Sequence, residues 1–210
     1  PLARTQVMGS VNVTPDSFSD GGLWFDAGRA VAHGLELAAE GADLLDVGGE
    51  STRPGSAEVD EAEELRRVLP VIRALAEQSG VPVSVDTRRP TVARAAVDAG
   101  ACIVNDIMPF AADAAMAAAV RETGAGVVVM HLRGTPQTMA QCAVYGDVVA
   151  EVEDALKGAV TYAEAQGIAR ERVVIDPGIG FAKTTAHNLA LLAETERLAR
   201  IAPLLVGASR

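Results

Sequence analysis

The chain has 210 residues, of which 49% are hydrophobic and 22% are charged, so it can bury a sizeable core and most simply forms one domain. Its formal net charge is −10 and its basic residues are scattered among acidic ones, so nucleic acid is not an expected partner. We also expect no membrane partner and a cytoplasmic location, because the sequence has neither an apolar run near the roughly 20 residues of a membrane span nor a signal-peptide profile.

Short apolar or β-branched runs recur along the chain without alternating polar positions. Runs of this kind predict strands that are buried on both faces of a parallel sheet. The predicted strands are Gln6–Val11, Leu44–Val47, Val81–Val85, Cys102–Val104, Val127–Met130, Val173–Ile175 and Leu204–Val206.

Helical patterns lie between these runs. Apolar helical faces are formed by Val31, Gly34, Leu35 and Ala38, by Leu65, Val68, Leu69, Ile72 and Leu75, and by Val149, Val152, Leu156 and Val160. We expect Asp147 to cap the third helix and Pro70 to leave the second helix in one piece. A glycine follows several helical stretches just before the next strand, which predicts left-handed C-caps. These glycines are Gly41, Gly80, Gly100, Gly124 and Gly167.

The order strand, helix, strand recurs throughout, which is typical of either a doubly wound sheet or a barrel. The first strand–helix junction has no G-x-G-x-x-G, and this argues against the doubly wound alternative. A complete barrel typically needs about 250 residues. We therefore predict an α/β fold, a TIM-type (β/α)8 barrel as a single domain over residues 1–210, lacking the C-terminal helices and the eighth strand.

Polar residues follow nearly every predicted strand. Any one of them could cap a helix or form a hydrogen bond at the rim, but a polar group at the end of almost every strand is costly without a ligand. In barrel enzymes the carboxyl ends of the strands form the substrate site. The residues at these ends are Asn12, Asp46, Asp86, Asn105, Asp106, His131, Asp176, Ser209 and Arg210.

The residue types at these ends suggest the kind of ligand. Inward-turned Asp and Asn side chains offer planar acceptor and donor–acceptor pairs, which suit a flat, nitrogen-rich heterocycle. The loop Glu50–Gly55 adds an arginine and hydroxyls, which suit a phosphate or a carboxylate. The loop Thr14–Gly22 is long and turn-rich enough to act as a lid, although each loop alone reads as a solvated turn.

Several segments, in order along the chain, resemble the motifs of the dihydropteroate synthase family. They are Asn12–Gly22, Asp46–Gly55, Ser84–Thr87, Asn105–Asp106, Met130–His131 with Gly134–Pro136, Asp176–Phe181 followed by Lys183–Thr184, and Gly207–Arg210. The resemblance implies a transferase of folate synthesis that joins 6-hydroxymethyl-7,8-dihydropterin pyrophosphate to 4-aminobenzoate. It also implies a homodimer.

The resemblance also assigns roles to individual residues. It implies that Asp86, Asn105 and Asp176 hold the pterin edge, that Met130 and Phe181 line its ring, and that Ser209 is a further substrate contact. Asn12 would help place Mg²⁺, the implied cofactor, and the pyrophosphate, while Thr52 and Arg53 would serve the pyrophosphate and the aminobenzoate. Asp86, Arg53 and Asn12 are the candidate catalytic residues.

Two alternatives remain open at this point. A pterin-dependent methyltransferase barrel could share the Asp and Asn residues, but it has no use for the long first loop or for Thr52 and Arg53. A paralogue that binds pterin without catalysis is the other alternative. His131 is left either as a site residue or as a residue of the rim.

Overall fold

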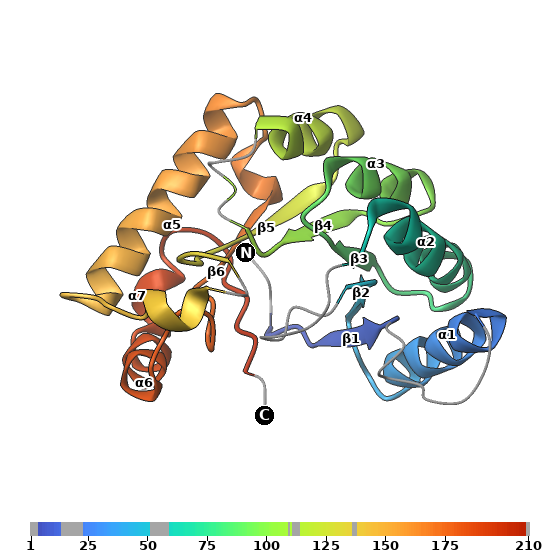
Figure 1. The fold of residues 1–210 in the computed structure, drawn as a ribbon, viewed down its shortest axis with the longest axis horizontal. Coiled ribbons are helices and arrows are strands. Elements are labelled where there is room, and N and C mark those ends of the chain that lie inside the picture. Colours follow the sequence, from blue (N-terminus) through green and yellow to red (C-terminus); the bar gives the residue numbers. More distant parts are fainter. Residues whose placement is uncertain are drawn as a thin grey trace. The chain divides into compact units, whose positions relative to one another are not determined.

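The computed structural model describes residues 4–13, 23–50, 59–108, 110, 114–135 and 138–208, with only the backbone described for residues 23–26. The described chain divides into two compact units, of which the first ends at Asn105 and the second begins at Asp106. Each unit is built from strands and helices in alternation (Figure 1). The expected single domain over residues 1–210 stays a prediction.

The first unit contains parallel strands in the order of the sequence, β1 beside β2, β2 beside β3 and β3 beside β4. Its elements are β1 (Met8–Asn12), α1 (Leu23–Ala39), β2 (Leu44–Gly48), α2 (Glu61–Gln78), β3 (Val83–Asp86), α3 (Pro90–Asp98) and β4 (Ile103–Asp106). Helices α1, α2 and α3 lie along one side of these strands (Figure 1). Each strand is followed by a helix that leads to the next strand, which is the β-then-α repeat that the sequence predicted.

Helix α2 follows from local sequence signals. The side chain of Asp60 accepts a hydrogen bond from the backbone N–H of Glu63 at 2.8 Å, which is an N-cap. Pro70 is exposed inside the helix, and the helix continues past it, as expected. Val68, Ile72 and Leu75 are fully buried, as predicted.

Two further positions of the predicted face lie at its margin. Leu65 and Leu69 are only half-buried, while Glu64 and Val71 take their place in the core. A helical pattern read from apolar residues alone cannot include Glu64, whose burial depends on an ion pair with Arg89.

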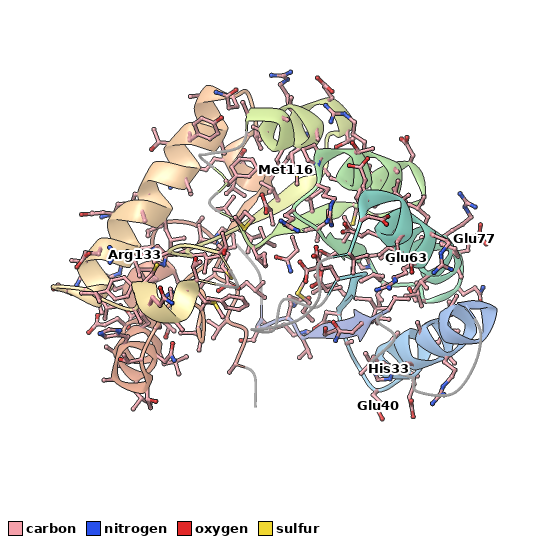
Figure 2. The ribbon with its side chains drawn as sticks, viewed as in Figure 1. His33, Glu40, Glu63, Glu77, Met116 and Arg133 are labelled. Atoms are coloured by element: carbon pink, nitrogen blue, oxygen red, sulfur yellow. The ribbon has the colours of Figure 1, made fainter. Side chains whose placement is uncertain are left out.

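The second unit contains β5 and β6, which pair in parallel from Val127 beside Val173 to Met130 beside Asp176. Its elements are α4 (Ala114–Thr123), β5 (Gly126–Met130), η3 (Met139–Cys142), α5 (Val148–Ala165), η4 (Arg170–Arg172), β6 (Val173–Asp176), α6 (Thr185–Ala193) and α7 (Thr195–Leu198). Met116 of α4, labelled in Figure 2, is fully buried.

The predicted cap of α5 is confirmed. The Asp147 carboxylate accepts from the backbone N–H groups of Val149 and Ala150, at 3.0 and 3.1 Å. The predicted inward residues Val149, Val152, Leu156 and Val160 are all buried. Here the sequence pattern and the packing agree because no charged group replaces an apolar one on the buried face.

The predicted strand Leu204–Val206 is shorter in the structure. Leu204 forms a single parallel bridge with Ile175, supported by a hydrogen bond from Leu205 N to the carbonyl oxygen of Ile175 at 2.8 Å. This segment therefore starts beside β6, in the order that the sequence predicted.

The predicted cap glycines are confirmed. Gly41, Gly80, Gly100, Gly124 and Gly167 all have positive φ, between 71° and 116°. Side chains other than glycine rarely adopt this conformation, so each glycine allows its helix to end and the next strand to begin.

Candidate active site

The register of the first unit places several predicted site residues in one row. Asn12 pairs with Gly48, Gly48 with Asp86, and Asp86 with Asn105. Registered partners on neighbouring parallel strands share one face of the sheet. Asn12, Asp86 and Asn105 therefore meet at the carboxyl end of the strands, as the sequence predicted.

Gly48 lies between Asn12 and Asp86 in this row and has no side chain to fill the space between them. A Cβ placed there would lie 3.4 Å from Oδ2 of Asp86. A larger side chain would lie against the Asp86 carboxylate, so the glycine leaves room for a ligand atom on that side. Asp86 is half-buried, which suits a carboxylate that must meet both the protein and a substrate.

Asp46 lies deeper than expected. It was read as the end of the second strand, but β2 continues for two residues to Gly48, so that reading was wrong. Asp46 pairs with Ser10 and Ser84 in the register, two residues below the row of Asp86. Its Oδ2 atom accepts a hydrogen bond from Nδ2 of Asn105 at 2.9 Å.

The Asp46 carboxylate is poised for a further donor. Its Oδ1 atom is buried and has no hydrogen-bond partner among the described residues, and the same holds for the nearby Oγ of Ser84. Burial raises the pKa of Asp46, and the neighbouring Ser84 hydroxyl and the Asn105 amide oppose this rise. A buried acceptor without a donor is costly, and two donors could serve this one: the Ser84 hydroxyl beside it and an N–H group of a ligand.

An ion cluster lies at the ends of the segment 51–58. We define it as Glu50, Glu64, Arg88 and Arg89. Arg89 donates to Glu64, to Glu50 at 3.0 Å and to the carbonyl oxygen of Val59, while Glu50 accepts from the N–H of Val59 at 3.3 Å. The cluster therefore ties residue 50 to residue 59. Thr52 and Arg53, the predicted contacts for pyrophosphate and aminobenzoate, lie outside the described residues, as does Ser209.

In the second unit, Asp176 ends β6 as predicted and is buried. Its Oδ1 atom accepts a 2.7 Å hydrogen bond from the N–H of Gly178. Burial raises the pKa of Asp176 to about 6, against the opposing effects of this hydrogen bond and of the Lys183 charge. A carboxylate held in this way can accept from a donor edge of a heterocycle while remaining largely ionised at neutral pH.

Lys183 and His131 form a contact that the sequence did not single out. Nζ of Lys183 lies 3.1 Å from Nδ1 of His131 and donates to two carbonyl oxygens, that of Phe181 at 2.9 Å and that of His131 at 3.3 Å. Burial lowers the pKa of Lys183 to about 8. Burial, followed by the charges of Lys183 and Arg133, lowers the pKa of His131 to about 4. His131 is therefore neutral at pH 7, beside a protonated lysine.

The predicted ring-lining residues lie together. Met130 is buried in a cluster with Ile107, Leu132, Met139 and Ala182, and Phe181 is half-buried against this cluster. Apolar side chains of this kind can cover the flat face of an aromatic ligand and keep water from it. The two predicted residues thus share one apolar surface of the second unit.

Asp106, at the end of β4, and Arg133, three residues after β5, both contact neighbouring parts of the chain. Asp106 is buried and its Oδ1 atom accepts from the N–H of Met108 at 2.9 Å, which is a local turn. Arg133, labelled in Figure 2, lies 4.0 Å above the centre of the Tyr145 ring and pairs with Glu151 at 2.5 Å. These contacts hold the segment after β5 in place.

The row in the first unit fits a magnesium ion that is held mainly by a substrate. Among the described residues, no group of three or more His, Cys, Asp or Glu side chains could hold a metal ion. Mg²⁺ often binds through very few protein oxygens together with water and phosphate oxygens. Asn12 is exposed and its Nδ2 atom lies 3.4 Å from Oγ of Ser10, so its Oδ1 atom can face an ion and a pyrophosphate.

The helices of the described chain give no candidate for a membrane-crossing segment, since none is both long and apolar enough.

Comparisons with known proteins bear on this geometry. The family model described as pterin binding enzyme matches residues 8–210. A dihydropteroate synthase from Mycobacterium leprae is 51% identical to this chain over 211 residues, covering 100% of this chain and 74% of that protein.

Two solved structures from Xanthomonas albilineans are similar in both sequence and fold. A dihydropteroate synthase with 4-aminobenzoic acid has 51% identity and a TM-score of 0.91, covering 99% of this chain and 74% of its own. A second, in complex with 7,8-dihydropteroate, has 48% identity and a TM-score of 0.87, covering 99% of this chain and 73% of its own.

Proposed function

This chain belongs to the pterin-binding enzyme family with the dihydropteroate synthases, transferases of folate biosynthesis with the TIM-type α/β fold, and we propose that it condenses 6-hydroxymethyl-7,8-dihydropterin pyrophosphate with 4-aminobenzoate. The products are 7,8-dihydropteroate and pyrophosphate. The observation that carries this proposal is the buried Asp46–Asn105 pair, a carboxylate and an amide that are fixed side by side and suit the hydrogen-bonding edge of a heterocycle.

We propose that the pterin binds through its hydrogen-bonding edge. The amidine-like part of a pterin carries N–H donors beside ring-nitrogen and carbonyl acceptors. Oδ1 of Asp46 would accept one donor, and the Asn105 side chain, fixed by its bond to Asp46, would meet the neighbouring position. The family resemblance gives three further proposed pterin contacts, all in the second unit: Asp176 offers an acceptor, and Met130 and Phe181 offer an apolar surface that suits the face of a ring.

Asp86 is proposed to stabilise positive charge during the reaction. The C–O bond between the pterin methylene and pyrophosphate breaks, and its electron pair leaves with the pyrophosphate. The methylene becomes electron-poor, and a half-buried carboxylate at the strand ends would stabilise that charge. The lone pair of the aminobenzoate nitrogen then forms the C–N bond, and the nitrogen loses one proton to water or to pyrophosphate.

Positioning supplies much of the remaining rate. An aromatic amine is a weak base whose lone pair is already available at neutral pH, so no strong general base is required. Holding the two reactants in contact makes the attack effectively unimolecular. Thr52 and Arg53 are proposed to hold the pyrophosphate and the aminobenzoate, with the ion cluster anchoring residues 50 and 59 on either side of them.

Mg²⁺ is the proposed cofactor. When bound, it would neutralise charge on the pyrophosphate oxygens. Asn12 is the proposed protein ligand, since its exposed amide stands in the same row as Asp86.

A methyltransferase remains the alternative from another reaction class. It would bind a reduced folate with the same Asp and Asn residues, but it would release no pyrophosphate. The identity of 51% to a dihydropteroate synthase over the whole chain favours the synthase.

We also propose a homodimer in the cytoplasm. The dimer rests on the family resemblance and on exposed apolar residues of α6, where Leu189 and Leu192 are 63% and 37% exposed. Sedimentation velocity of the purified chain tests the dimer, and a single monomer peak across the micromolar range would contradict it.

The test of the proposed reaction is pyrophosphate release. Release should require the pterin pyrophosphate, 4-aminobenzoate and Mg²⁺ together, and Asp86→Asn should lower kcat/KM by about a hundredfold or more. Asp98→Asn, at an exposed position at the end of α3, is the matched control and should leave the rate unchanged. Release without aminobenzoate at the full rate would instead indicate a hydrolase.

A further inference from the structure

Lys183 makes an unusually complete set of contacts for a lysine. It is one of only two lysines in the chain, the other being Lys157. An ammonium group has three protons, and Nζ of Lys183 has three acceptors within reach: Nδ1 of His131, the carbonyl oxygen of His131 and that of Phe181. By contrast, Lys157 lies on the exposed side of α5 and pairs with Glu153 at 2.7 Å.

These contacts join the ends of two strands. His131 follows β5, and Lys183 follows the loop that begins with Asp176 at the end of β6. The N–H of His131 also donates to the carbonyl oxygen of Asp176 at 2.9 Å. Lys183 thus closes the 176–183 loop against the end of β5.

The loop fits closely at Gly178. This residue has φ of +69°, and a Cβ placed there would lie 2.2 Å from the carbonyl oxygen of His131 and 3.3 Å from Nζ of Lys183. Only glycine lets the loop approach the carbonyl group that Lys183 also binds.

We propose that Lys183 is a positioning residue for the pterin: it locks His131 as the Nε2–H tautomer, fixes the backbone at Phe181 and supplies the positive charge beside Asp176. This inference rests on the proposed function, because Asp176 and Phe181 are the proposed pterin contacts. Lys183 itself has no spare proton for the ligand, so it acts through these neighbours.

The tautomer follows from the chemistry of the two groups. A protonated lysine can only donate, so Nδ1 of His131 must accept and its proton must be on Nε2. Neutral His131 then presents an N–H donor on the ring atom that faces away from Lys183. A donor of this kind, with the Asp176 acceptor on the neighbouring strand, suits a ring that carries both acceptors and donors.

The charges around His131 and Asp176 favour a neutral His131 beside an ionised Asp176. Lys183 faces Asp176 and His131, and Arg133, Glu151 and Tyr145 lie around His131. The Lys183 charge lowers the pKa of Asp176 against the effect of burial, and it also lowers the pKa of His131. Lys183 thus adds to burial in keeping His131 neutral, and it adds to the Gly178 hydrogen bond in keeping Asp176 ionised.

The first test needs no substitution. In a ¹⁵N-histidine NMR spectrum at pH 7, His131 should show the Nε2–H tautomer. His187 is an internal reference, because its Nδ1 atom accepts from the N–H of Thr184 at 3.3 Å and does not depend on Lys183. A His131 signal from the Nδ1–H tautomer, or from a charged ring, would overturn the proposal.

The second test compares Lys183→Met with Lys157→Met. Calorimetric titration with the pterin pyrophosphate should show an affinity about tenfold to a hundredfold lower for Lys183→Met, as expected for a lost charge-assisted network. Binding by Lys157→Met should equal that of the unaltered chain, and Lys183→Arg should bind more tightly than Lys183→Met because it keeps the charge. The His131 tautomer signal should change only in Lys183→Met.

The outcomes separate this inference from the proposed function. If the unaltered chain does not bind the pterin pyrophosphate, the proposed function fails. If the unaltered chain binds and Lys183→Met binds equally well, the positioning role of Lys183 is wrong and the function stands.

Discussion

Asn105 on β4 donates a 2.9 Å hydrogen bond to Asp46 on β2, and so links two strands that flank β3. The bond uses one carboxylate oxygen of Asp46 and leaves the other buried, without a donor among the described residues. A protein gains no stability from such an atom. The Ser84 hydroxyl beside this carboxylate is one possible donor, and an N–H group of a bound pterin is the other.

Asp46→Asn should therefore stabilise the free protein and weaken pterin binding. Burial raises the pKa of Asp46 above its usual value of 3.8, so the ionised form costs stability at neutral pH. The sign follows from proton linkage. The cost is absent well below the ordinary pKa of 3.8, where the carboxyl is protonated in both states, and it grows as pH rises from there through the folded-state pKa. Urea unfolding at pH 7 should show a gain of about 1–2 kcal/mol.

The same substitution should lower pterin affinity by about tenfold to a hundredfold, because an amide N–H would face the ligand donor. The stability gain should shrink when both proteins are compared at pH 3.5. An Asp46→Asn protein that is less stable at pH 7, or that binds the pterin as tightly, would contradict this assignment.

Pterin binding should depend on pH through Asp176 and Lys183. Burial raises the pKa of Asp176 to about 6 and lowers the pKa of Lys183 to about 8. Affinity should rise as pH increases through about 6, where Asp176 ionises, and fall above about 8, where Lys183 loses its proton. Calorimetry with the pterin pyrophosphate between pH 5 and pH 9, corrected for phosphate ionisation, measures this profile; a flat profile is incompatible with the account.

Gly178→Ala should destabilise the chain far more than Gly180→Ala. Both glycines have positive φ, at 69° and 84°, so alanine is strained at each. At Gly180 a Cβ would meet nothing within 4 Å, whereas at Gly178 it would lie 2.2 Å from the backbone oxygen of His131. Chemical denaturation should show a loss of about 1 kcal/mol for Gly180→Ala and at least about 2 kcal/mol more for Gly178→Ala. Equal losses would mean that the loop does not sit against β5 as described.

Arg89→Met should be strongly destabilising. Glu64 is 1% exposed and pairs with Arg89, so removing the guanidinium leaves a buried carboxylate with its main partner gone. The expected loss is about 3–5 kcal/mol. Arg66→Met is the control, because its pair with Glu63 lies near the surface and should contribute less than about 1 kcal/mol. Similar losses for the two variants would argue against a buried ion cluster.

The sequence predicted the elements that depend on local signals. The cap glycines and the Asp147 cap follow from residues that act within a few positions of themselves. The sequence also predicted that Asn12, Asp86 and Asn105 lie at the carboxyl ends of their strands. They form one row because parallel strands of similar length end at one edge of the sheet.

What the sequence did not predict depends on contacts between distant segments. The depth of Asp46 is set by the register of β2 against β3, and the burial of Glu64 by Arg89. Lys183 stood in a recognised motif, but its role depends on His131, 52 positions earlier in the chain. A polar residue in an apolar helical face, as at Glu64, is the signal that could have indicated a buried ion pair.

The most direct test of the central claim is product formation. The chain should be incubated with the pterin pyrophosphate, ¹³C-labelled 4-aminobenzoate and Mg²⁺, and the mixture analysed by mass spectrometry. Labelled 7,8-dihydropteroate should form in amounts equal to the pyrophosphate released. Binding of both substrates with pyrophosphate release, but without any labelled pteroate, would contradict the proposed reaction.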